Sequence, residues 1–285
     1  MIRMRTYLVS TWQDIRALPL KLAKDREAIL VIALTLLPWV FLFVRKADLS
    51  ELEQLGGFIG FIAFYWLVCH RRPLESNPVR KPRSELAAAI GFVILWILYR
   101  VGEYWHLYAI PSLGVNACGS DGDVIVIKMI EMVAAPLLLL LVMKYTLPEM
   151  GISWSRFAWL TALLPISALV ATGVSHHPLG QFATSSACYF FGAGLPEEFL
   201  FRVFLQTRLE AVLHRPLWAL WIASFIFGLT HIPIDLHGSF VHWQDALLTA
   251  LTFQMSAGVA FGYAYMRTRN LAPLSILHTV LDSAL

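Results

Sequence analysis

Long apolar runs separated by short polar segments dominate the chain after its first 27 residues. A helix needs about 20 apolar residues to cross the ~30 Å hydrocarbon core of a bilayer, and most runs reach or approach that length. The pattern predicts an all-α fold, a polytopic transmembrane helical bundle with about 8–9 spans. The nine predicted spans are residues 28–44, 55–70, 86–101, 124–144, 157–174, 182–206, 217–232, 246–266 and 271–285.

Lys and Arg concentrate in alternate loops between these spans. The polar, basic N-terminal arm predicts no cleavable signal peptide. Loops 102–123, 175–181 and 232–245 contain neither Lys nor Arg, whereas the loops between them are basic. Because basic loops stay in the cytoplasm, we expect a multi-pass protein of the cell membrane with a cytoplasmic N-terminus.

Composition excludes several classes of protein. With 58% hydrophobic and 14% charged residues, the chain is too apolar for a soluble enzyme or a secreted disulfide scaffold. A formal net charge of +3 gives no footprint for nucleic acid. The three cysteines, Cys69, Cys118 and Cys188, have no CxxC spacing, so we predict small apolar residues and no disulfide.

Residues 71–83 are the best candidate for a linker. The segment contains three prolines and five basic residues. It is expected to run along the cytoplasmic surface, where it either meets anionic lipid or serves only as a topology signal.

The sixth span contains ionisable residues, which are costly inside a bilayer. Its glycines and Pro196 predict that the helix breaks or restarts there, with Glu197 and Glu198 at a positive helix N-terminus. Glu198 and Arg202 are four residues apart and are expected to form an ion pair. Glu197 is then left free to face a cavity.

Four further spans carry polar residues. The seventh ends in His231, and the ninth contains His278 and Asp282 on one helical face. The fourth contains Lys128 and Glu131, three residues apart, which we expect to neutralise one another. The eighth has a small-residue stripe suited to close helix packing, with one polar member facing the same interior. The stripe comprises Ala246, Ala250, Gln254, Gly258 and Gly262.

A carboxylate and a histidine that converge on a wet cavity can activate water for hydrolysis. Glu197 would take the proton and His231 would orient the water, while His278 and Asp282 stabilise an oxyanion. Glu197, His231 and His278 also match the His₂Glu set of a catalytic zinc site, although we favour no cofactor. A purely structural network is the remaining alternative. Straight helices would place these three side chains roughly 16, 24 and 14 Å from their basic ends, which argues against a shared depth.

Three motifs resemble those of the CAAX-protease and bacteriocin-processing (CPBP) intramembrane proteases. They are Glu-Glu-x-x-x-Arg at 197–202, Phe-x-x-x-His at 227–231 and His-x-x-x-Asp at 278–282. The resemblance implies a catalytic helical core at residues 155–285, with residues 1–154 as accessory membrane helices. It implies Glu197 as general base with His231 on the water, Glu198 and Arg202 as supports, and His278 near the oxyanion. Position 282 is often Asn in the family, so Asp282 puts its oxyanion role in doubt.

The resemblance implies an intramembrane endopeptidase that is reached from the cytoplasm and acts on membrane-associated or C-terminally anchored proteins, prenylated CAAX-like proteins among them. A glutamic mechanism is favoured over a metalloprotease, although the metal dependence of the family is disputed. The expected partners are such a substrate and the lipid bilayer, with no nucleic acid. A non-catalytic immunity or scaffold protein of the same family, or a transporter, is the alternative.

Overall fold

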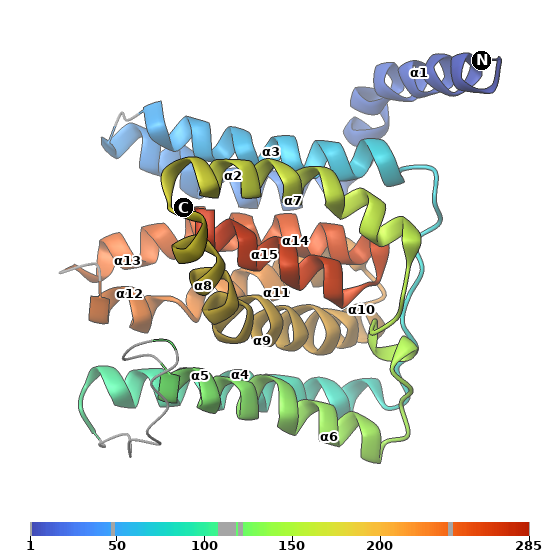
Figure 1. The fold of residues 1–285 in the computed structure, drawn as a ribbon. Coiled ribbons are helices and arrows are strands. Elements are labelled where there is room, and N and C mark those ends of the chain that lie inside the picture. Colours follow the sequence, from blue (N-terminus) through green and yellow to red (C-terminus); the bar gives the residue numbers. More distant parts are fainter. Residues whose placement is uncertain (1, 47–48, 108–117, 119–121, 239–241, 285) are drawn as a thin grey trace.

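Helices that run back and forth between two ends form the molecule (Figure 1). The computed structural model describes residues 2–46, 49–107, 118, 122–238 and 242–284. The predicted all-α polytopic bundle is confirmed. Among the described residues, seven helices are long and apolar enough to cross a membrane, and they correspond to every predicted span except the sixth and the ninth.

The sixth and ninth predicted spans have different characters. The sixth lies within a helical run from Leu179 to Leu213 that carries buried charges and π turns. The ninth is a helix of 14 residues, which at 1.5 Å per residue is only about 21 Å long. Both are surrounded by longer helices, so neither needs to cross the bilayer unaided.

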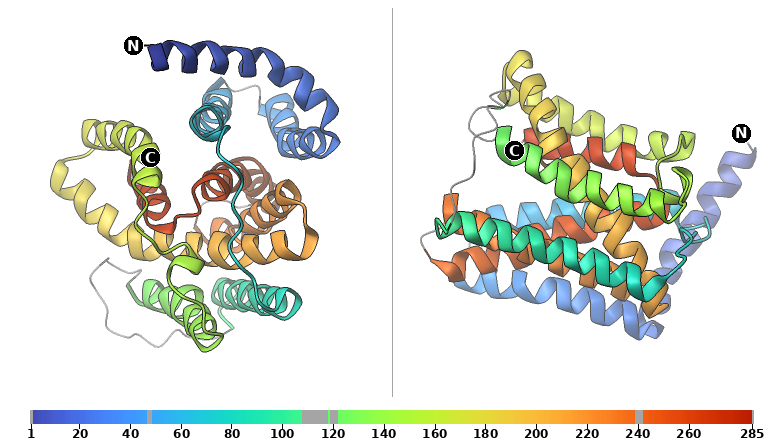
Figure 2. Two further views of the ribbon diagram at one scale, coloured as in Figure 1. Left: turned by 90° about the vertical axis from the view of Figure 1, so that its right-hand side faces the viewer. Right: turned by 90° about the horizontal axis from the view of Figure 1, so that it is seen from below.

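The first four helices precede or flank the predicted linker. Helix α2 begins after Asp25, whose carboxylate accepts the backbone N–H of Ala28 at 3.0 Å. Helix α4 begins at Pro82, where the missing N–H costs no hydrogen bond. Figure 2 shows α1 outside the bundle, beside α2 and α3. Their bounds are Ile2–Lys24 for α1, Arg26–Lys46 for α2, Leu49–Cys69 for α3 and Pro82–Tyr104 for α4.

The middle of the chain forms two spans. Helices α5 (Gly122–Met129) and α6 (Ala135–Val142) are continuous through the π turn η2 (Ile130–Ala134). After the 3-10 turn η3 (Pro148–Met150), the hydroxyl of Ser155 caps α7 (Arg156–His176).

The C-terminal part begins with one helical run: α8 (Leu179–Tyr189), the π turn η4 (Phe190–Gly194), α9 (Leu195–Glu198), the π turn η5 (Phe199–Gln206) and α10 (Thr207–Leu213). It continues with α11 (Pro216–Leu229), α12 (Ile232–Gly238), α13 (Trp243–Thr249), the π turn η6 (Ala250–Gln254), α14 (Met255–Thr268) and α15 (Leu271–Ala284). Every residue of η5 is buried, and α14 is buried over most of its length, so these elements form the centre of the bundle.

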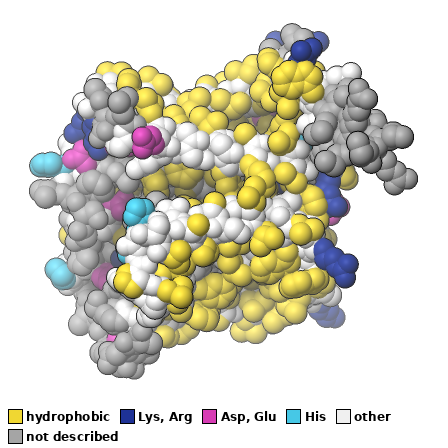
Figure 3. Space-filling view, turned by 45° about the horizontal axis from the view of Figure 1, so that its top comes forward, with side chains coloured by type: hydrophobic (Ala, Val, Ile, Leu, Met, Phe, Trp, Pro, Cys, Tyr) yellow, Lys and Arg dark blue, Asp and Glu magenta, His cyan; other side chains and the backbone are white. Residues whose placement is uncertain are grey.

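The loops rich in Lys and Arg gather at one end of the bundle, which we call the basic end. It contains residues 70–81, 143–155, 214–215 and 269–270, on the right of Figure 1. Figure 3 shows hydrophobic side chains over the middle of one face and blue Lys and Arg side chains at its edges. This distribution matches the charge alternation on which the predicted topology rests.

The predicted linker 71–83 lies against the basic end of the bundle. Arg71 donates to Asp14 at 3.1 Å, and the Arg72 guanidinium lies over the ring of Phe157. Arg269, at the tight turn between α14 and α15, donates to the backbone carbonyl of Glu75 at 2.7 Å. Part of the basic charge of this segment is therefore used for contacts within the protein.

The small-residue stripe allows α11 and α14 to approach closely, as predicted. A Cβ atom added at Gly262 would lie 2.4 Å from Leu220, and one added at Gly258 would lie 3.0 Å from Ser224. On the facing helix, Gly228 fits against the carbonyl oxygen of Ala250, only 2.4 Å from where its Cβ would stand. Helix packing here depends on the absence of side chains.

Two of the three cysteines contradict the sequence prediction. Cys118 and Cys188 form a disulfide that links the connection between α4 and α5 to α8. Cys69 is a buried free thiol, in accordance with its predicted role as a small apolar residue. The bridge joins residues 70 positions apart, a separation that no local spacing reveals.

We expect Gly228→Ala to lower the thermal stability of the detergent-purified protein by about 1–3 kcal/mol, because the added methyl meets rigid backbone. Gly60→Ala is the matched control, since nothing lies within 4 Å of its Cβ position. Unfolding midpoints followed by circular dichroism would measure both. Equal midpoints for the two variants would contradict the close packing of α11 against η6.

Candidate active site

A bend in one helical run positions the two adjacent glutamates. The sequence predicted a helix break at Gly192–Pro196, and this prediction is wrong: the backbone stays helical through η4 and α9. Pro196 cannot donate a hydrogen bond to the preceding turn, and the π turn η4 accommodates this defect without ending the helix. Figure 1 shows α8 steeply inclined to α9 on either side of this turn.

Gly194 brings this bend into contact with α15. A Cβ atom there would lie 2.2 Å from the Thr279 hydroxyl and 2.5 Å from the Ser275 carbonyl oxygen. Only glycine lets the two helices approach to this distance. The approach places His278 opposite Glu197 and Glu198.

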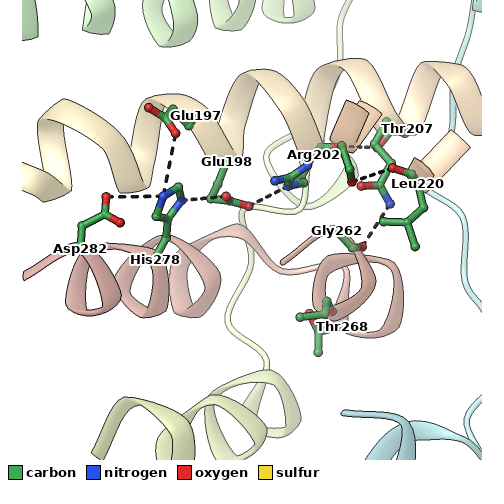
Figure 4. A network of polar contacts seen from close by, with 12 residues as sticks. Glu197, Glu198, Arg202, Thr207, Leu220, Gly262, Thr268, His278 and Asp282 are labelled. Carbon is green, nitrogen blue, oxygen red and sulfur yellow. Dashed lines mark hydrogen bonds and ion pairs between the residues drawn. The ribbon is translucent and has the colours of Figure 1, made fainter. Parts of the chain in front are cut away.

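Glu198 is fully buried and is held at both carboxylate oxygens (Figure 4). Arg202 Nε donates to its Oε2 at 3.1 Å, which is the predicted ion pair. His278 Nδ1 donates to its Oε1 at 2.8 Å, a contact that the sequence did not predict. Glu198 therefore connects its own helical run to α15.

Glu197 faces two histidines with one carboxylate oxygen. Its Oε2 lies 4.0 Å from His231 Nε2 and 3.8 Å from His278 Nε2. Both distances are too long for a direct hydrogen bond and are suited to a bridging water molecule. Straight helices would have placed these three side chains at different distances from the basic end. The folded protein brings them together, because the helices bend or end beside them.

The His231 ring is oriented by its own helix. Its Nδ1 donates to the backbone carbonyl of Phe227 at 2.9 Å, which directs Nε2 toward Glu197. The ring packs edge-on against the Phe227 ring at 4.7 Å. These two contacts hold the imidazole in a single orientation.

Asp282 lies beside the same His278 ring nitrogen that faces Glu197. Its Oδ2 is 3.5 Å from His278 Nε2, and its side chain is 29% exposed (Figure 4). The His278 ring stacks on Phe261 at 4.7 Å. His278 is consequently fixed on three sides, by Glu198, Asp282 and Phe261.

Gln254, the remaining predicted site residue, does not join this group. It is half-buried at the end of η6 and forms no hydrogen bond with Glu197, His231 or His278. The π turn η6 interrupts the four-residue spacing from which its direction was predicted.

The contact between Lys128 and Glu197 was not predicted from the sequence. The Lys128 Nζ lies 2.5 Å from Glu197 Oε1, with side chains only 10% and 8% exposed. The predicted Lys128–Glu131 pair is wrong, since Glu131 lies in the π turn η2 and its buried Oε1 has no hydrogen bond within the described part of the chain. The cost of a lysine inside a span indicated that it needs a partner, but its spacing suggested the wrong one.

A line of polar side chains leads from the site toward the basic end. Polar residues recur every four positions along this run, at 198, 202, 206 and 210, and all four are buried. Gln206 Nε2 donates to Glu210 Oε1 and to the Gly262 carbonyl, both at 3.2 Å. Arg269 donates to Glu210 Oε2 at 2.6 Å and completes the line.

The described side chains around Glu197 do not form a metal-binding cluster. Within the described ranges, no group of three or more His, Cys, Asp or Glu side chains is arranged to hold an ion. In addition, the Lys128 ammonium already contacts one oxygen of Glu197. A second cation at this carboxylate would meet electrostatic repulsion.

Residues 179–284 match the family model described as Rce1-like: Type II CAAX prenyl endopeptidase Rce1-like. The chain thus carries a domain that is consistent with the CPBP proteases, and the family is one of intramembrane CAAX endopeptidases. Together with the seven apolar helices, the match indicates an integral membrane protein. No curated protein and no solved structure gave a significant match.

We expect Arg202→Met to destabilise the protein by about 3–5 kcal/mol, because the buried Glu198 carboxylate loses its guanidinium partner. Arg215→Met is the control, since this arginine is 69% exposed in its ion pair and should change stability by about 1 kcal/mol or less. Thermal unfolding in detergent would compare them. Similar unfolding midpoints would contradict the structural role of the buried pair.

Proposed function

We propose that this chain, whose residues 179–284 form an Rce1-like domain, cleaves peptide bonds of membrane-associated or C-terminally anchored proteins. Prenylated CAAX-like proteins are among the proposed substrates. One observation carries the proposal: Glu197 Oε2 faces His231 Nε2 at 4.0 Å and His278 Nε2 at 3.8 Å. This spacing leaves room for one reacting water among the three atoms.

In the proposed reaction, Glu197 is the general base. Its Oε2 takes a proton from the water, the water oxygen attacks the scissile carbonyl carbon, and the carbonyl oxygen becomes an oxyanion. The C–N bond then breaks, and the proton passes from Glu197 to the leaving amine. His231 orients the water, with its Nε2 directed by the hydrogen bond from Nδ1 to the Phe227 carbonyl.

His278 is the proposed donor to the oxyanion. In the imidazolium form both ring nitrogens are donors, with Nδ1 engaged by Glu198 and Nε2 directed into the site. An ionised carboxylate only accepts hydrogen bonds, so Asp282 is proposed to act on the ring of His278 rather than on the oxyanion.

A glutamic mechanism without a cofactor is favoured over zinc. The ammonium group of Lys128 beside Glu197 supports this choice, because it supplies the positive charge that would otherwise come from a metal. Zinc held by Glu197, His231 and His278 is the alternative mechanism, and a chelator distinguishes the two.

An apolar groove supports a lipid-like or hydrophobic substrate segment. It has a volume of about 480 Å³ and lies between the α5–α6 span and η4. Met129 and Phe191 line it, and Lys128 is next in sequence to Met129. We place the apolar part of the substrate there, on the side of the site from which α5 presents Lys128 to Glu197.

We expect Glu197→Gln to lower the cleavage rate at least 10²-fold, because glutamine cannot accept the proton of water. Detergent-purified protein would be assayed on a panel of C-terminally anchored peptides, with and without chelator. Glu51→Gln is the control, since this residue pairs with exposed Lys46 at the end opposite the basic one.

Full cleavage by Glu197→Gln would rule out this carboxylate as the base. Loss of activity on chelation, with recovery on addition of zinc, would favour the metal mechanism. A wild-type protein that cleaves no peptide would favour the immunity, scaffold or transporter alternatives.

The basic end is proposed to face the cytoplasm, with the active site reached from that side. The positive-inside rule supports this orientation, and so does the disulfide on the connection opposite the basic end, since disulfides persist in oxidising compartments. We expect that a membrane-impermeant maleimide labels Cys118 and Cys188 in intact cells only after an impermeant reductant is added. Labelling without reduction would contradict the bridge, and labelling only in lysed cells would reverse the orientation.

A further inference from the structure

Lys128 contributes to the candidate site from outside the Rce1-like domain. It lies on α5, more than 50 residues before the matched segment begins at residue 179. Its Nζ contacts Glu197 Oε1 at 2.5 Å and lies over the ring of Trp96, 5.3 Å from the centroid. The lysine thus meets a carboxylate on one side and an aromatic face on the other.

The burial of this lysine requires a compensating charge. Inside a span, an unpaired ammonium is costly, because no water solvates it. Glu131, the acid nearest in sequence, does not supply the charge, and Glu197 does. Because both side chains are at most 10% exposed, water screens their attraction only weakly.

The contact also determines which oxygen of Glu197 is available. Lys128 occupies Oε1, and both histidines face Oε2. The neighbouring Glu198 also has a cationic partner on one oxygen, Arg202 on Oε2, but His278 donates directly to its Oε1. Each glutamate therefore has a cationic side chain on one oxygen and faces imidazole with the other.

We propose that Lys128 is a positioning residue for the proposed hydrolysis: its ammonium holds Glu197 Oε1, so that Oε2 is directed at the reacting water. The inference rests on the proposed function. It also makes the N-terminal half of the chain part of the catalytic unit, since α5 supplies the lysine and α4 supplies Trp96.

The first test compares kcat and KM in the full-length, detergent-purified protein. We expect Lys128→Met to lower kcat about 10²-fold with KM little changed, because a misdirected carboxylate slows the chemical step and not substrate binding. Lys81→Met is the control, since this lysine is exposed at the basic end. Lys128→Ala should recover part of its kcat with propylammonium and none with equimolar sodium.

The second test measures the pair without an activity assay. Lys128→Met and Glu197→Gln should each lower the unfolding midpoint. The double variant should lose less than the sum of the two single losses, since it leaves neither buried charge of the pair without its partner. Additive losses would overturn the contact, whatever the activity. Wild-type kcat in Lys128→Met beside an inactive Glu197→Gln would overturn the positioning role and leave the proposed function intact.

Discussion

The site depends on charge matching between buried side chains. Glu198 and Arg202 are both fully buried, and the desolvation of either one alone would cost several kcal/mol. The hydrogen bond from His278 satisfies the second oxygen of Glu198 and ties the bent helical run to α15. This three-residue link helps to fix the relative position of the two helices that present Glu197 and His278.

Two adjacent glutamates therefore have different surroundings. Glu198 is saturated by partners and has a structural role, whereas Glu197 keeps one oxygen directed at two histidines that it does not touch. The difference comes from the elements that face each residue: Glu198 meets its own helix and α15, and Glu197 also meets α5. The catalytic proposal follows from this asymmetry.

Hydropathy and charge alternation predicted the helical class, seven of the nine spans and the basic end, because the bilayer imposes simple rules on length and composition. Spacing of four residues also predicted the Glu198–Arg202 pair, since this pair lies on one helix. The contacts that sequence reasoning missed, Lys128 with Glu197 and Cys118 with Cys188, join distant parts of the chain. Gln254 and Glu131 were misplaced for another reason: each lies in a π turn, where the side-chain register differs from that of the α-helix assumed in the prediction.

The π turns also set how the chain tolerates changes in length. A π turn bonds each residue to the fifth along instead of the fourth, so it stores one residue more than an α turn. Deleting one residue within Phe190–Gly194 would convert η4 to ordinary α-helix and leave Glu197 and the residues after it near their original register. The same deletion in α10 would rotate everything beyond it by about 100°. Length variation among natural relatives of this helix should therefore be concentrated at its π turns.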